Sequence, residues 1–103
     1  MGYSIMTQTT KLLKVGISKG NARVWLAQLD RYGWATGQCI SIVYGIDTIT
    51  ISKDDAGKRK VTSPSAGGVV DVTGPKVSEF TRGAASVTVS FNQSTITITK
   101  VTS

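Results

Sequence analysis

The chain has 103 residues, with 12 Lys plus Arg, six Asp plus Glu, no histidine and one cysteine. This length suits a single domain with one small core, and a composition of 40% hydrophobic and 17% charged residues is typical of a globular protein. The lack of histidine excludes Ser-His-Asp and Cys-His catalysis, His-ligated zinc and an imidazole pH switch. A lone Cys39 cannot form an intramolecular disulfide, so we expect a reducing, cytoplasmic environment.

Membrane insertion and enzymatic chemistry are not expected either. Apolar runs are too short for a membrane span, and residues 1–10 lack the apolar core of a signal peptide. The sequence shows no nucleophile with an activating base and no cluster of metal ligands. We therefore predict a protein that is not an enzyme, with no cofactor, no metal and no membrane partner.

The net charge is +6, and its distribution is uneven. Residues 1–60 contain nine basic and four acidic side chains, whereas residues 61–103 contain three and two. A basic surface that only confers solubility is one interpretation of this excess. Binding of a polyanion through the first half of the chain is the other.

In chain order, the first predicted element is a short amphipathic helix over residues 24–32, with Trp25, Leu26 and Leu29 at helical spacing. Gly33 stands where a left-handed carboxy-terminal cap is favoured. Alternation of apolar and polar residues then predicts a hairpin with strands at 39–44 and 47–52. Residues 54–68, rich in Lys, Ser, Gly and Pro, are interpreted as an exposed linker. A second hairpin is predicted at 86–91 and 95–99.

These elements form an internal repeat. Residues 40–53 (ISIVYGIDTITISK) match residues 87–100 (VTVSFNQSTITITK) at an offset of 47. Upstream, residues 15–20 resemble residues 70–75 at an offset of 55, which predicts that the second copy is shorter by most of its helix. We therefore expect a first repeat at 11–53, a linker at 54–68 and a helix-shortened repeat at 69–101. Because neither half is long enough to bury a core alone, the halves are expected to pack or interleave into one pseudo-symmetric core, and whether they swap hairpins or simply stack remains open.

Residues 14–53 resemble the AbrB/MazE swapped-hairpin family of DNA-binding proteins. Ser18-Lys19-Gly20 is similar to the family's turn between its first strands, and Leu29 to its helix core position. Gly33-Trp34 and Gly37 are similar to the helix exit, in the form found in the SymE-like branch of the family. The resemblance implies a mainly β fold with one short helix, in which the two tandem halves form a swapped-hairpin barrel within one chain.

The resemblance also implies DNA binding through the amino-terminal strands and their loops. Lys and Arg there would neutralise phosphates, while Asn21 and Arg23 would reach base edges. A solvated basic turn is the alternative for this cluster, and Lys58-Arg59-Lys60 is interpreted as either a phosphate-binding flap or a solvated charge run. The candidate nucleic-acid-binding residues are Lys14, Lys19, Asn21, Arg23, Arg31, Lys53, Lys58, Arg59 and Lys60.

The remaining candidates are interpreted structurally. Tyr32, Trp34 and Tyr44 are expected to be core aromatics rather than platforms for stacking single-stranded bases. Cys39 is expected to be a small buried hydrophobic residue.

Three functions follow from this sequence. The first is an AbrB-like transcriptional regulator, encoded by a phage or mobile element, that binds double-stranded DNA. The second is a protein-interaction module that docks on a host enzyme or RNA polymerase, and the third is a SymE-like RNA-binding toxin. A monomer with internal pseudo-symmetry and a homodimer both remain open.

Overall fold

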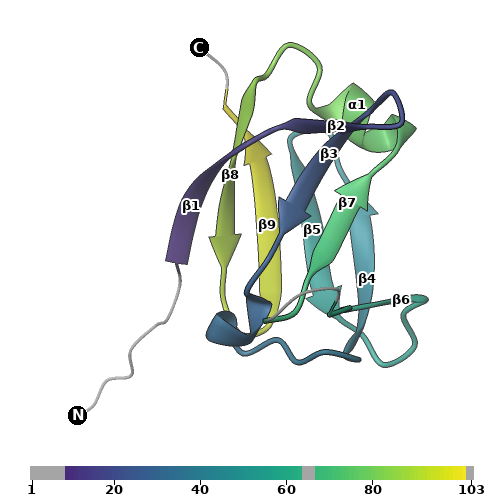
Figure 1. Cartoon of the computed structure of the whole chain (residues 1–103), viewed down its shortest axis with the longest axis vertical. Coiled ribbons are helices and arrows are strands. Elements are labelled where there is room, and N and C mark those ends of the chain that lie inside the picture. The colour runs from purple at the N-terminus through teal and green to yellow at the C-terminus, as the bar shows by residue number, and fades with distance from the viewer. Residues whose placement is uncertain (1–8, 64–66, 102–103) are drawn as a thin grey trace.

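A computed structural model describes residues 9–63 and 67–101 of the chain as two antiparallel β-sheets stacked on each other (Figure 1). Most of residues 1–10, in which no signal peptide is expected, lies outside the described residues. The chain is mainly β, as predicted. Among the described residues, no helix combines the length and the apolar character needed to span a membrane.

The larger sheet has six strands in the order β1-β8-β9-β5-β4-β6, and the smaller sheet has three in the order β2-β3-β7. The strands of the larger sheet are β1 (Thr9–Lys14), β8 (Ser86–Phe91), β9 (Thr95–Lys100), β5 (Thr48–Lys53), β4 (Cys39–Tyr44) and β6 (Arg59–Lys60). Those of the smaller sheet are β2 (Gly16–Ser18), β3 (Asn21–Leu26) and β7 (Val70–Thr73). The helical elements are the 3-10 helix η1 (Leu29–Tyr32) and the α-helix α1 (Pro75–Phe80).

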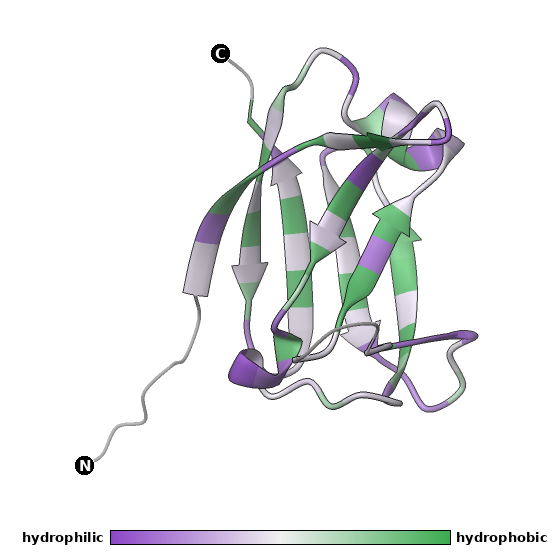
Figure 2. Cartoon of the chain, in the orientation of Figure 1, coloured by the Kyte–Doolittle hydropathy of each residue, from purple (hydrophilic) through white to green (hydrophobic). Residues whose placement is uncertain are grey.

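The two predicted hairpins are confirmed as β4–β5 and β8–β9. Along β5, β8 and β9, apolar residues alternate with polar ones (Figure 2), as a sheet with one buried face requires. Ile49, Ile51, Ile96 and Ile98 are fully buried against the smaller sheet. The outward face of β5, β8 and β9 carries serine and threonine, so it presents hydroxyl groups and almost no charge, whereas β4 exposes Val43 there.

The two sheets are connected differently on their two sides. On one side β1 runs into β2 with only Val15 between them, so a continuous segment joins the larger sheet to the smaller one. On the other side β6 pairs with β4 over two residues before the chain turns toward the smaller sheet. The sheets do not close into a barrel.

The pairing registers relate the two halves of the chain by an approximate twofold axis. An offset of 47 residues carries the Ile40–Lys53 pair of the first hairpin onto the Val87–Lys100 pair of the second. Between the hairpins, Thr50 of β5 pairs with Thr97 of β9, which is its own counterpart in the repeat. Each hairpin is therefore rotated onto the other about this Thr50–Thr97 pair.

The whole strand order obeys the same relation. Rotation exchanges β5 with β9, β4 with β8 and β6 with β1, so the six-stranded order reads the same from either end. In the smaller sheet, Val24 of β3 faces Val72 of β7. Because β1 of the first half pairs with β8 of the second, and β6 of the second with β4 of the first, the halves interleave, which is one of the two expected arrangements.

The predicted helix over residues 24–32 is wrong. Ala22, Val24 and Leu26 are buried at a spacing of two, which makes residues 21–26 a strand, β3, between β2 and β7. Gln28 then takes a left-handed conformation, with φ of 56°, and only the 3-10 helix η1 follows. The expected left-handed cap at Gly33 is confirmed by its φ of 89°.

The prediction of a helix-shortened second repeat is wrong as well. The α-helix lies in the second half, where Pro75 occupies the first turn and suits a helix start. The offset of 55 misplaced this segment, because β7 is followed by α1 and β8 just as β3 is followed by η1 and β4. β7 is therefore the counterpart of β3 rather than of the strand before it.

The segment at 54–68 is only partly an exposed linker. Residues 64–66 lie outside the described residues, but Arg59 and Lys60 form β6. Val61 is almost fully buried, and its N–H donates to the carbonyl of Gln38 at 3.0 Å. The segment thus contributes an edge strand and a core residue, which its polar composition concealed.

Candidate nucleic-acid interface

The outward face of the smaller sheet combines cationic and aromatic side chains. Arg23 and Trp25 alternate on β3 with the buried Val24, so both point away from the core. Trp25 is 40% exposed, and the Arg23 guanidinium carbon lies 4.3 Å from the centroid of its ring. This cation–π contact holds the arginine over the sheet rather than free in solvent.

Asp71 of β7 connects two arginines on this face. Its carboxylate accepts a hydrogen bond from Arg23 Nε at 3.0 Å, and its main-chain carbonyl accepts one from Arg59 at 2.9 Å. Both side chains of the Arg23–Asp71 pair are about one-third exposed, at 33% and 35%, so solvent screens the pair. Arg59 crosses from the larger sheet to the smaller one to make its contact, so both arginines bond to Asp71, Arg23 through the carboxylate and Arg59 through the main chain.

A shallow hollow of about 370 Å³ borders this face, where β1 bends into β2. Its lining residues are Leu13, Lys14, Gly16, Ile17, Arg23 and Trp25. Arg23, Trp25, Asp71 and Arg59, together with this hollow, are called the arginine face below.

Two further predicted residues lie near the arginine face. Lys19 occupies the turn between β2 and β3, is exposed and has a φ of 54°. Asn21 begins β3, but its side-chain carbonyl accepts a hydrogen bond from the Ser78 hydroxyl at 3.4 Å. Lys19 is therefore placed to meet a polyanion, whereas Asn21 is held by α1.

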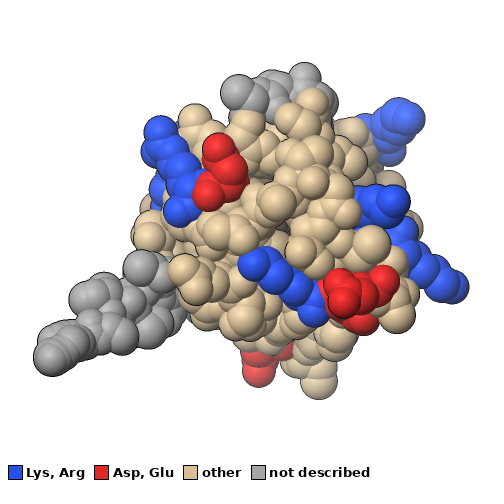
Figure 3. Space-filling view, turned by 90° about the horizontal axis from the view of Figure 1, so that it is seen from below, with Lys and Arg blue, Asp and Glu red and all other residues tan. Residues whose placement is uncertain are grey.

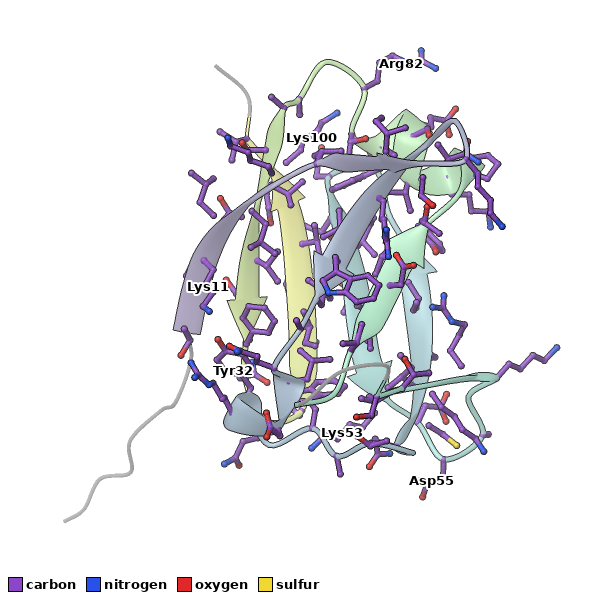
Figure 4. The ribbon with its side chains drawn as sticks, in the orientation of Figure 1. Lys11, Tyr32, Lys53, Asp55, Arg82 and Lys100 are labelled. Carbon is purple, nitrogen blue, oxygen red and sulfur yellow. The ribbon has the colours of Figure 1, made fainter. Side chains whose placement is uncertain are left out.

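Four predicted residues do not join the arginine face. Lys53 donates to the carbonyl of Gly33 at 2.7 Å and lies 5.1 Å from the Trp34 ring centroid, at the lower end of the molecule (Figure 4). Arg31 is exposed on η1, and Lys58 precedes β6. Lys60 pairs with Cys39, a position on the outward face of the larger sheet.

Basic side chains at this lower end are separated rather than gathered into one patch. Figure 3 shows that lysine and arginine occur in several places there, with acidic side chains beside some of them. The nine predicted residues therefore do not share one surface, and only Arg23 and Arg59, with Lys14 and Lys19 at the margins, come together.

Trp25 is the residue of this face that the sequence analysis assigned to a helix core. The alternation of buried Ala22, Val24 and Leu26 with polar neighbours was the signal that could have identified it as outward-facing. The expectation for Trp34 is confirmed: it is fully buried, and its Nε1–H donates to the carbonyl of Asn92 at 2.7 Å. Tyr32 and Tyr44 are partly buried against the core, and Cys39 is half-buried rather than buried.

Comparison with known proteins identifies no relative. No family model, no curated protein and no solved structure matches the chain. Among residues 9–63 and 67–101, no group of three or more acidic or cysteine side chains is arranged to hold a metal ion.

Proposed function

We propose that this protein binds double-stranded DNA through the arginine face, as a small regulator of the AbrB-like kind. The observation that carries the proposal is the convergence of Arg23 and Arg59, from different sheets, on the surface that also exposes Trp25. Guanidinium groups suit phosphate contacts because they present several donors in one plane. Lys19, in the adjacent turn, extends the cationic surface along β3.

The interleaved halves support the finer fold assignment. We infer that β1 and β6, which each pair with a strand of the other half, correspond to the exchanged elements of a swapped-hairpin arrangement. Within one chain, this arrangement gives the two halves unequal surfaces. Arg23 of β3 has Asp71 as its counterpart on β7, so the face carries charge of opposite sign in the two halves. A bound duplex would therefore be held asymmetrically.

The proposal is tested by a gel-shift salt series with the full-length protein, a short DNA duplex and the matching single strand. Arg23→Ala combined with Arg59→Ala is expected to weaken duplex binding and to reduce the slope of log K against log salt by roughly 0.9 for each phosphate that is no longer neutralised. Arg31→Ala combined with Arg82→Ala removes two exposed arginines that do not belong to the arginine face, and serves as the charge-matched control. Equal weakening in the two double variants would contradict the assignment of this face.

Asp71→Asn is expected to change the DNA affinity in the opposite direction. It removes the negative charge that pairs with Arg23, so we expect tighter DNA binding, at a stability cost of at most about 1 kcal/mol because the ion pair is one-third exposed. Unchanged or weaker duplex binding by this variant would also count against the arginine face. If the protein prefers the single strand and Trp25→Ala loses this preference, stacking of bases on Trp25 is the mode of binding in place of duplex recognition.

A further inference from the structure

The outer edge of β4 is paired at one end only. Cys39 and Ile40 pair with Lys60 and Arg59 of β6, and no strand of the described residues pairs with that edge beyond Ile40. The counterpart strand, β8, is paired along its whole length by β1. Compared with a fully twofold-symmetric sheet, the position beside β4 is therefore only half occupied (Figure 1).

The hydrogen-bonding groups at this position can be identified. On the β5 side, Cys39 accepts from Asp54 at 2.9 Å and Gly45 donates to Thr48 at 2.8 Å. Since antiparallel strands direct alternate residues to opposite sides, Ile42 and Tyr44 direct their N–H and C=O groups toward the open edge. Their counterparts on β8 are Val89 and Phe91, which β1 pairs with Lys11 and Thr9.

Two aromatic side chains on this side, Tyr44 and Phe80, line a hollow. The rings of Tyr32, in the first half, and Phe91, in the second, stack with their centroids 4.3 Å apart. The counterparts of these residues are Phe80, the last residue of α1, and Tyr44. Phe80 and Tyr44 instead line a hollow of about 570 Å³, together with Ile46, which is 89% exposed.

Cations surround the open edge. Lys76 Nζ lies 5.4 Å from the Tyr44 ring centroid, and Lys100 Nζ lies 6.0 Å from the Phe80 ring centroid. A second hollow of about 400 Å³ follows β4 past Ile42 and shares Tyr44 with the first. Its other wall includes Lys58 and Arg59. The two hollows together contain four basic residues and two acidic ones, Asp54 and Glu79.

We propose that the open edge of β4 docks an extended acidic segment of a partner protein. The segment pairs with β4 in line with β6, along the part of β4 that β6 leaves unpaired. Main-chain hydrogen bonds to Ile42 and Tyr44 would supply affinity, as in other additions of a strand to a sheet edge. An apolar side chain of the segment fills the hollow between Tyr44 and Phe80, and flanking carboxylates meet Lys76 and Lys100. This inference does not depend on DNA binding, because none of these residues except Arg59 belongs to the arginine face.

The test uses full-length protein and a fluorescein-labelled peptide of alternating glutamate and apolar residues, EVEFEVEG. We expect saturable binding by fluorescence anisotropy. We also expect slower amide hydrogen exchange at Ile42 and Tyr44, with no change at Val43, which already pairs with Thr50. A peptide with prolines in place of the central glutamates, EVPFPVEG, lacks two central main-chain donors and two carboxylates, and is expected to bind at least about tenfold more weakly.

Charge reversal provides the matched variants. Lys76→Glu with Lys100→Glu is expected to weaken EVEFEVEG binding by at least about tenfold and to favour the lysine peptide KVKFKVKG. Arg31→Glu with Arg82→Glu is the charge-matched control, because both are exposed cations that line neither hollow, and Arg82 lies at the same end of the molecule as Lys100 (Figure 4).

Three results would overturn the proposal. The first is equal binding of the proline peptide. The second is absence of EVEFEVEG binding, or binding that does not protect the amides of Ile42 and Tyr44. The third is protection of these amides by a DNA strand or by self-association of the protein in the absence of peptide. Loss of DNA binding alone would affect only the arginine face.

Discussion

At the scale of single residues, Trp34 shows how one side chain fixes the packing of both halves. It has the largest fully buried side chain of the described residues, and it reaches from the segment after η1 to the Asn92 carbonyl in the β8–β9 turn. The residue type and the preceding Gly33 were enough to predict its burial. Its hydrogen-bond partner, 58 residues away, was not accessible to local sequence patterns.

Trp34→Phe is expected to lower the free energy of unfolding by about 1–3 kcal/mol, because it leaves a small cavity and removes the donor to the Asn92 carbonyl. Urea unfolding followed by circular dichroism measures this loss. Trp25→Phe is the matched control at an exposed site, and its expected effect is within about 0.5 kcal/mol. A larger loss for Trp25 than for Trp34 would contradict the burial assigned to each.

At the scale of elements, the hairpins were predictable and the helix was not. Residues 48–52 and 86–91 alternate strictly between polar and apolar side chains, so the strand period there is unambiguous. Leu26 fits two patterns equally well, since it belongs to a helical stripe with Leu29 and to a strand alternation with Val24. Pairing of β3 with β7, which lies more than 40 residues later, decides between them. The arginine face was missed for the same reason, since it exists only when β3 is a strand beside Asp71.

The placement of β6 depends on a glycine. A side chain at Gly57 would overlap the carbonyl oxygen of Ile40, so Gly57→Ala is expected to shift the turn that leads into β6. We expect a loss of about 1–3 kcal/mol in unfolding free energy and faster amide exchange at Val61, which bonds to Gln38.

Gly16→Ala is the control for this substitution, because the nearest atom to its new Cβ is 3.7 Å away and its φ is not positive. Its expected effect is below about 0.5 kcal/mol. Equal exchange at Val61 in both variants would show that the close approach of Gly57 to β4 does not hold β6 in place.

At the scale of the whole molecule, the repeat in the sequence predicted two similar hairpins, and the chain length predicted that they share one core. The way they share it could not be read from either copy. It depends on β1 and β6 each leaving their own half, and on the Thr50–Thr97 pair that joins the hairpins. The asymmetry between a six-residue β1 and a two-residue β6 is what leaves the β4 edge open.

This interleaving predicts that neither half folds alone. Cutting the chain after Asp55 separates β1 from β8, β4 from β6, β5 from β9 and β3 from β7, so every interface between the halves becomes intermolecular. We expect fragments 1–55 and 56–103 each to lack a cooperative thermal transition, because each would expose half of the apolar core. Mixed in equal amounts, they are expected to recover a 1:1 complex with the circular dichroism spectrum of the intact chain. A dispersed amide spectrum from either fragment as a monomer would instead mean that the halves are independent units, and the shared core would then contribute little to stability.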